Sequence, residues 1–245
     1  MNSRPRKWVF FAAVALALGY CGPARAELVL ELNTTGNPPL NTTERSGFLD
    51  RIAAEALRRV GGRLETIALP AERGLLEASQ GFADGEISRI AGLEQHYPNI
   101  VPVPEKIMDW HFMAFGRGVT SLPDGWESLQ HHSVAIINGW KVLEANIPQS
   151  ADLLKVKTPE QLFSMLAAGR VDIVIFEKWG GLRQLRDQAL QNVTMIEPPL
   201  ISREMFIYLN KRHAALVEPL AQALRDMKND GTYARLYDET ISSGE

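Results

Sequence analysis

The sequence has only one cysteine among 245 residues, and this scarcity excludes two kinds of protein. A single cysteine cannot build a disulfide framework or a zinc site made of several thiolates. The five histidines do not occur at a metal-binding spacing such as His-Glu-x-x-His, so we predict no metal site. The two glycine-rich motifs that bind phosphate groups, the P-loop and Gly-x-Gly-x-x-Gly, do not occur in the sequence. The Gly-x-Ser-x-Gly motif of serine hydrolases does not occur either, and we predict no cofactor.

The chain also lacks an excess of charge of one sign. It carries 26 Lys and Arg against 29 Asp and Glu, a net charge of −3, without a basic block. Binding to nucleic acid requires a basic surface, so we predict no nucleic-acid partner. The hydrophobic content of 45% is ordinary for a chain with a buried core. These values indicate a globular protein of one large or two small domains.

The N-terminus has the pattern of a secretory signal peptide. Three of the first seven residues are basic, an apolar stretch over 8–19 follows, and residues 24–26 form a small-x-small cleavage site. The apolar stretch is shorter than the roughly 20 residues of a membrane span, and Cys21 lacks the small preceding residue of a lipid-attachment site. We therefore predict cleavage of residues 1–26 and a soluble protein in the bacterial periplasm.

Hydrophobic periodicity predicts alternating strands and helices in the mature chain. Residues 27–32 alternate like a strand, and residues 48–60 place apolar side chains on one helical face. Residues 158–169 start with a helix-capping pattern, and residues 171–176 are almost wholly apolar, as in a parallel strand covered on both faces. A further amphipathic helix covers 216–227. This alternation predicts an α/β fold.

Two distant segments share one pattern, in which a helix ends at Gly-x-x-Asp and runs into a strand. The first contains Asp84 and the second Asp172, and the residue five positions further on is charged in both, Arg89 and Glu177. Ligands of open α/β sheets bind outside the carboxyl ends of strands. We therefore expect two lobes of similar construction that present a cation and an anion to a shared cleft.

The mature chain resembles the family 3 extracellular solute-binding proteins, the type that delivers polar amino acids to ABC transporters. The resemblance rests on Gly47-Phe-Leu-Asp50 at the first helix, the two Gly-x-x-Asp segments, and Val134-Ala-Ile-Ile-Asn-Gly139 in place of the family's strand-to-Gly turn. It also rests on Leu209-Asn-Lys211 and on Lys228-Asn-Asp-Gly-Thr-Tyr233, which is its strongest single signature. It covers essentially the whole mature chain.

The resemblance implies a type II periplasmic-binding-protein fold, with two α/β lobes joined by a two-strand hinge. Lobe one would comprise 27–115 and 204–245, and lobe two 116–203. The implied function is that of a monomer that is not an enzyme and captures a small polar solute by hinge closure, an amino acid or a related zwitterion or carboxylate, for a membrane permease. Two alternatives are a bilobal sensor or orphan binding protein that signals to a membrane partner, and a cleft lyase or dehydratase that uses a carboxylate such as Glu177 or Glu86 as a general acid.

The charged site residues are assigned partly against the family pattern. The family's Thr-x-x-Arg motif, whose arginine grips the ligand carboxylate, is absent here, and its register falls near His96. We expect Arg89 to clamp a ligand carboxylate, with Arg73 as the second candidate. Glu177 matches the family's ammonium-binding acid. The structural alternatives are an Arg89 ion pair with Glu86 or Glu72, a solvated Arg73 and an exposed Glu177.

The aromatic candidates are Trp110, Trp140 and Trp179. Trp140 replaces a small hydroxyl residue that helps hold the carboxylate in the family, which argues against an ordinary α-amino acid. The three indoles are predicted to form a platform for a ligand with a flat or aliphatic body, or a cationic head. Their structural alternative is packing in the core or the hinge.

Overall fold

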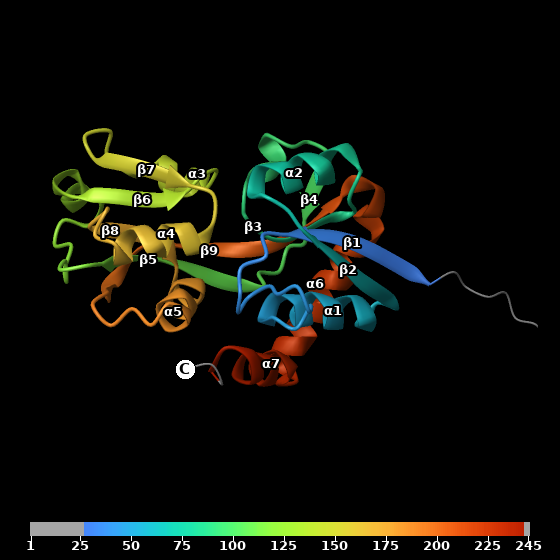
Figure 1. Ribbon diagram of the computed structural model, residues 1–245. Helices are drawn as coiled ribbons and strands as arrows, with labels where there is room; N and C mark the ends of the chain where they lie inside the picture. Colours follow the sequence, from blue (N-terminus) through green and yellow to red (C-terminus); the bar gives the residue numbers. More distant parts are fainter. Residues whose placement is uncertain (1–26, 243–245) are drawn as a thin grey trace, which may run out of the picture.

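The computed structural model describes residues 27–242, and the predicted signal peptide lies outside them. These residues form two α/β lobes joined by two long strands, as the fold prediction requires (Figure 1). None of the helices within residues 27–242 combines the length and the apolar sequence that a membrane-spanning helix needs. The strands are β1 (Leu28–Thr34), β2 (Gly62–Ala68), β3 (Gly85–Ile90), β4 (Ile100–Pro102), β5 (Met108–Gly116), β6 (Ser133–Ile137), β7 (Asp152–Val156), β8 (Ile173–Glu177) and β9 (Thr194–Asn210).

The helices cover both faces of the sheets. In lobe one, α1 packs against α6 and α7, whereas α2 packs against β1 and β3. In lobe two, α4 packs against β6 and β8, and α5 packs against β5 and β8. The helices are α1 (Phe48–Arg59), α2 (Ala71–Gln80), α3 (Lys141–Glu144), α4 (Pro159–Ala167), α5 (Lys178–Asp187), α6 (Val217–Asn229) and α7 (Thr232–Thr240), with short 3₁₀ helices η1 (Leu93–Gln95), η2 (Gly125–His131) and η3 (Lys211–Leu216).

One path of hydrogen-bonded strands runs through both lobes, in the order β2-β1-β3-β9-β5-β8-β6-β7, and β4 also pairs with β9. Strands β5 and β9 are the two that connect the lobes (Figure 1). Their antiparallel register shifts between Phe112 and Ala114, where β5 advances by two residues and β9 by five. The irregularity lies in the middle of the connection, where the regular ladder of hydrogen bonds is interrupted.

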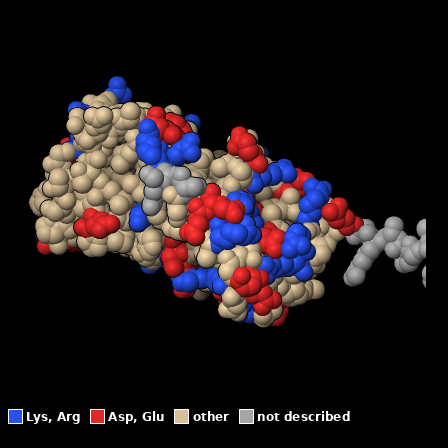
Figure 2. All heavy atoms as spheres, turned by 90° about the horizontal axis from the view of Figure 1, so that it is seen from below, with Lys and Arg blue, Asp and Glu red and all other residues tan. Residues whose placement is uncertain are grey.

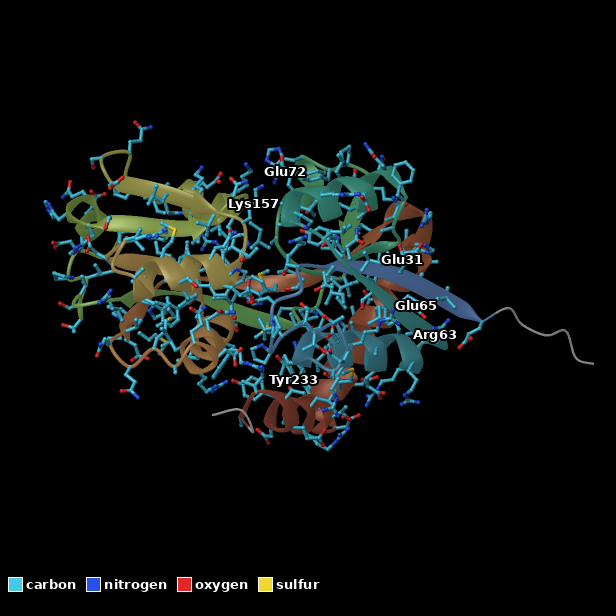
Figure 3. The ribbon with its side chains drawn as sticks, viewed as in Figure 1. Glu31, Arg63, Glu65, Glu72, Lys157 and Tyr233 are labelled. Carbon is cyan, nitrogen blue, oxygen red and sulfur yellow. The ribbon has the colours of Figure 1, made fainter. Side chains whose placement is uncertain are left out.

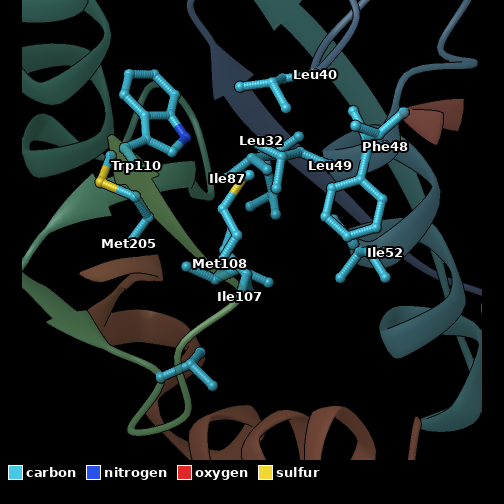
Figure 4. Packing of buried hydrophobic residues seen from close by; sticks show 14 of the residues in the cluster. Leu32, Leu40, Phe48, Leu49, Ile52, Ile87, Ile107, Met108, Trp110 and Met205 are labelled. Carbon is cyan, nitrogen blue, oxygen red and sulfur yellow. The ribbon is translucent and has the colours of Figure 1, made fainter. Parts of the chain in front are cut away.

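The buried face of α1 accounts for much of the lobe-one core. Phe48, Leu49 and Ile52 are fully buried and face Leu32 of β1 and Ile87 of β3 (Figure 4). This helix and α4 form where the sequence patterns predict them. The N-cap of α4 is Thr158, whose hydroxyl accepts a hydrogen bond from the Gln161 N–H at 3.3 Å. Because the apolar residues of α1 recur at helical spacing, burial fixes both its orientation and its register.

The two Gly-x-x-Asp segments have the same structural role. The Asp84 carboxylate accepts a hydrogen bond from the backbone N–H of Glu31 in β1 at 2.7 Å. The Asp172 carboxylate accepts one from the backbone N–H of Ser133, at the start of β6, at 2.9 Å. In each lobe the aspartate thus connects the turn before one strand to the neighbouring parallel strand. The repeated Gly-x-x-Asp pattern in the sequence therefore corresponds to two equivalent structural units.

The surface seen from below mixes positive and negative side chains over lobe one, whereas lobe two shows few charges on this face (Figure 2). Several of the charges on lobe one form ion pairs, such as Arg59 with Asp230 at 2.7 Å and Arg51 with Glu239 at 2.5 Å. The interspersed signs leave no extended basic surface on this face.

Candidate ligand-binding cleft

A cleft of about 530 Å³ lies between the two lobes. Lobe one contributes one wall from α2, the end of β3 and the η1 turn, and lobe two contributes the facing wall from the segment 139–146. The floor comes from β5 and β9, the strands of the hinge. A second hollow of about 320 Å³ adjoins the cleft and shares Thr35, Ala71 and Trp140 with it. Both spaces lie outside the carboxyl ends of the strands, where the fold class places ligands.

Aromatic rings form the floor of the cleft and its lobe-two side. Trp110 and Phe112 of β5 line it, and their ring centroids are 6.0 and 5.6 Å from that of Trp140. Trp140 also stacks on Phe176 at 4.8 Å with an interplanar angle of 17°. It immediately follows Gly139, which has a φ of 87° and so allows the chain to turn from β6 towards α3. Two of the three predicted tryptophans, Trp110 and Trp140, are therefore brought together in the cleft, whereas Trp179 is not among the residues that line it.

Arg89 lines the cleft, and its guanidinium contacts the Glu86 carboxylate and the Ala71 carbonyl of lobe one. One of its terminal nitrogens lies 2.7 Å from a carboxylate oxygen of Glu86 and donates to the Ala71 carbonyl at 3.0 Å. The Arg89 Nε has no hydrogen-bond partner and is buried. Burial raises the pKa of Glu86 to about 7, while the nearby guanidinium opposes that rise. The structure thus shows the ion pair with Glu86, the alternative considered from the sequence, and also places the guanidinium at the cleft wall.

Helix α2 packs directly onto this buried pair. A Cβ atom on Gly74 would lie 2.4 Å from a carboxylate oxygen of Glu86 and 3.4 Å from a terminal nitrogen of Arg89. The Asn33 amide of β1 donates to the Gly74 carbonyl at 3.1 Å. Glycine is therefore needed at position 74 because the carboxylate takes the space of a side chain.

Glu177 is fully buried, which rules out the exposed strand end considered from the sequence. Its carboxylate oxygens accept hydrogen bonds from the backbone N–H groups of Trp179 at 3.0 Å and Gly180 at 2.8 Å, so it caps α5. Burial raises its pKa to about 7, against the effect of these hydrogen bonds. Glu177 is not among the residues that line the cleft or the adjoining hollow.

The N-terminus of α5 also meets lobe one. A Cβ atom on Gly180 would lie 2.6 Å from the amide oxygen of Asn37, in the loop that follows β1. The Trp179 ring lies 6.1 Å from the Tyr237 ring of α7, edge to face. The Glu177 cap is thus part of a direct contact between the lobes.

Arg73 lies outside the cleft, as the solvated alternative expects. Its side chain is 67% exposed, and its Nε donates to Glu77 one helical turn further along α2 at 2.9 Å. The helical phase explains this position, because Ala71 and Leu75 of the same helix line the cleft. The structure therefore does not bring Arg73 together with Arg89.

Some residues at the cleft were missed by sequence reasoning. Arg203 of β9 lines the floor and lies opposite Trp110 in the β5–β9 register. Glu72 lines the cleft from α2, and Lys157 lines the adjoining hollow from lobe two; Figure 3 shows both towards the facing sides of the lobes. No local pattern marks Arg203, because its position depends on strand pairing between distant segments. Among the described residues, no group of histidine, cysteine, aspartate and glutamate could hold a metal ion.

Sequence comparison does not assign the chain to a family. No protein-family model matches the sequence. An uncharacterized protein from Shewanella oneidensis is 27% identical over 209 residues, which cover 81% of this chain and 77% of that relative.

Among solved structures, an ancestral arginine-binding protein bound to glutamine superposes with a TM-score of 0.75 at 18% identity, covering 89% of this chain and 99% of that one. A histidine kinase sensor domain with similarity to periplasmic binding proteins gives 0.75 at 17% identity, covering 88% and 96%. The GluR0 ligand-binding core from Nostoc punctiforme, in complex with glutamate, gives 0.72 at 20% identity, covering 87% and 99%. The chain therefore has the periplasmic-binding-protein fold.

Proposed function

We propose that the protein is a periplasmic solute-binding protein that captures a small organic solute by hinge closure and delivers it to an ABC transporter. The observation that carries this proposal is the cleft of about 530 Å³, whose walls come from different lobes and whose floor is the hinge. A ligand in this space touches both lobes and binds the closed form more tightly than the open form, which is the condition for ligand-driven closure. The volume suits a small molecule.

In this proposal Arg89 is the anchor for a ligand carboxylate, and Trp110 and Trp140 hold the ligand body. Glu177 keeps α5 and the contact between the lobes in place, and Arg73 has no part in the site. Lobe one comprises 27–115 and 204–245, and lobe two comprises 116–203.

The signal-peptide pattern and the fold support the proposed location and partner. Export through the signal peptide of residues 1–26 places the protein in the periplasm, where it acts as a monomer with a membrane permease. The structural neighbours include amino-acid-binding proteins of ABC transporters, which supports this choice. The sensor domain among the neighbours favours a second candidate, in which the closed form is read by a signalling partner.

We propose no enzyme activity for the cleft. Both carboxyl groups considered as general acids are committed elsewhere: Glu86 faces Arg89, and Glu177 caps α5. Neither lines the cleft, although a general acid must reach the proton that it transfers.

The test is a thermal-shift screen of the protein purified from the periplasm, with amino acids, polyamines, dicarboxylates, monocarboxylates and small peptides. A compound present at about 100 times its Kd raises the free energy of unfolding by about 2.7 kcal/mol, which is readily detected. Small-angle scattering with the best compound should then show a more compact protein. The proposal fails if well-folded protein is stabilised by no compound.

A further inference from the structure

We infer that the cleft binds a monocarboxylate that has an aromatic or branched apolar body and no ammonium group. This inference rests on the proposed function and specifies the ligand class of the same site. Three features of the cleft support it: the buried donors without partners, the apolar walls, and the balance of charges.

The first feature is a pair of unpartnered donors. Arg89 is 8% exposed and Trp110 is 5% exposed, and both line the cleft. The Arg89 Nε and the Trp110 Nε1 are buried, and neither has a hydrogen-bond partner in the described structure. Both groups can only donate. An unpartnered buried donor is costly, so the site favours a ligand that brings acceptor oxygens, as a carboxylate does.

The second feature is the character of the walls. Trp110, Phe112 and Trp140 present rings, and the lobe-one side adds Leu75 and Ile90. A flat or branched hydrocarbon body can displace water from these surfaces, whereas a polar side chain would lose its hydrogen bonds to water there. The ligand body is therefore expected to be apolar.

The third feature is the balance of charge: among the described residues that line the cleft, none offers a buried carboxylate to an ammonium group. Three of the residues that line the cleft are Lys or Arg, namely Arg89, Lys141 and Arg203, and one is acidic, Glu72. Glu72 is exposed at the start of α2, where an ion pair is screened by water. The carboxylate that the family pattern assigns to the ammonium group, Glu177, is occupied by two backbone N–H groups of α5. An α-amino acid would thus bury its ammonium group beside cations.

Two matched pairs of compounds test this inference by calorimetry. The pairs are 3-phenylpropanoate with phenylalanine, and 4-methylpentanoate with leucine; within each pair only the ammonium group differs. We expect one or both of the acids to bind. Each acid that binds should do so at least about tenfold more tightly than the amino acid of its pair. Two controls complete the set: 2-phenylethylamine lacks the carboxylate and propanoate lacks the body, and both should bind at least about tenfold more weakly than that acid.

A variant identifies the donor. Trp110→Phe removes the indole N–H and keeps an aromatic ring, so affinity for the acid should fall about tenfold or more, and the melting temperature without ligand reports whether the variant still folds. Two results would overturn the inference and leave the solute-binding proposal intact. In the first, the amino acid binds as tightly as its matched acid, or more tightly, in every pair that binds. In the second, a polyamine or a polar amino acid binds and neither acid does. A lack of stabilisation by every compound in the wider screen would overturn both.

Discussion

Substitution of Gly74 by alanine tests whether the buried Glu86–Arg89 pair determines the position of α2. In an ordinary helix this change stabilises by about 1 kcal/mol, because glycine is a poor helix former. Here the new Cβ would lie 2.4 Å from a Glu86 oxygen, whereas unstrained C···O contacts are about 3.3 Å or longer. Either the helix or the fully buried carboxylate must therefore move by about 1 Å. Overpacking of this kind costs about 1–3 kcal/mol, and separation of a buried ion pair costs more, so we expect a net destabilisation of about 2 kcal/mol.

The assay is urea unfolding followed by circular dichroism, in which a lower midpoint with an unchanged m-value reports lost stability. Ser79→Ala, near the end of the same helix, is the matched control; it should be neutral or stabilising by a few tenths of a kcal/mol, because alanine is the better helix former. Since Arg89 is paired with the Glu86 carboxylate, Gly74→Ala should also weaken ligand binding, whereas Ser79→Ala should not. A Gly74→Ala protein as stable as the wild type would refute the close packing on which the reasoning depends.

The remaining predictions concern charge. Burial raises the pKa of Glu86 and of Glu177 to about 7 in the folded protein, against 4.5 for the free side chain, so the folded protein holds protons that the unfolded chain releases. The stability that these bound protons contribute is present in full below pH 4.5 and is lost as the pH rises through 7. The urea midpoint should therefore fall between pH 5 and pH 8, and it should fall less for Glu177→Gln than for the wild type. Arg89→Ala should cost about 2–5 kcal/mol of binding by calorimetry, whereas Arg73→Ala should leave affinity unchanged; equal effects would remove the distinction between them. Asp50→Ala should destabilise by about 2–4 kcal/mol without changing ligand affinity, because the buried carboxylate accepts three hydrogen bonds, from the Asn41 amide and from the backbone at 42 and 47.

Much of the fold could be predicted from the sequence, because it depends on local patterns. The apolar stripe of α1, the capping residues of α4 and the continuous apolar run of β8 each report burial directly. The repeated Gly-x-x-Asp pattern also predicted two equivalent units, since Asp84 and Asp172 make the same hydrogen bond to a neighbouring strand. Such features need only short-range information.

The site was less predictable, because contacts between distant segments determine it. Arg89 reaches the cleft wall from the strand end where the pattern places it, but the packing of Gly74 of α2 onto its partner Glu86 brings together segments that no local pattern connects. The cap formed by Glu177 has no clear sequence signal, since glutamate is not among the residues preferred at that position. The exposure of Arg73 could have been found from the helical phase of α2.

The location of the floor on the hinge strands has a kinetic consequence. Trp110 and Phe112 lie on β5 beside its register shift, whereas Trp140 belongs to the lobe-two wall. A solute can therefore settle on the two floor rings while the mouth is open, and Trp140 covers it only when lobe two turns. A change to a floor ring therefore acts on the open and the closed complex alike, whereas a change to Trp140 acts on the closed complex, so Trp140 variants should mainly shorten the residence time of the bound solute.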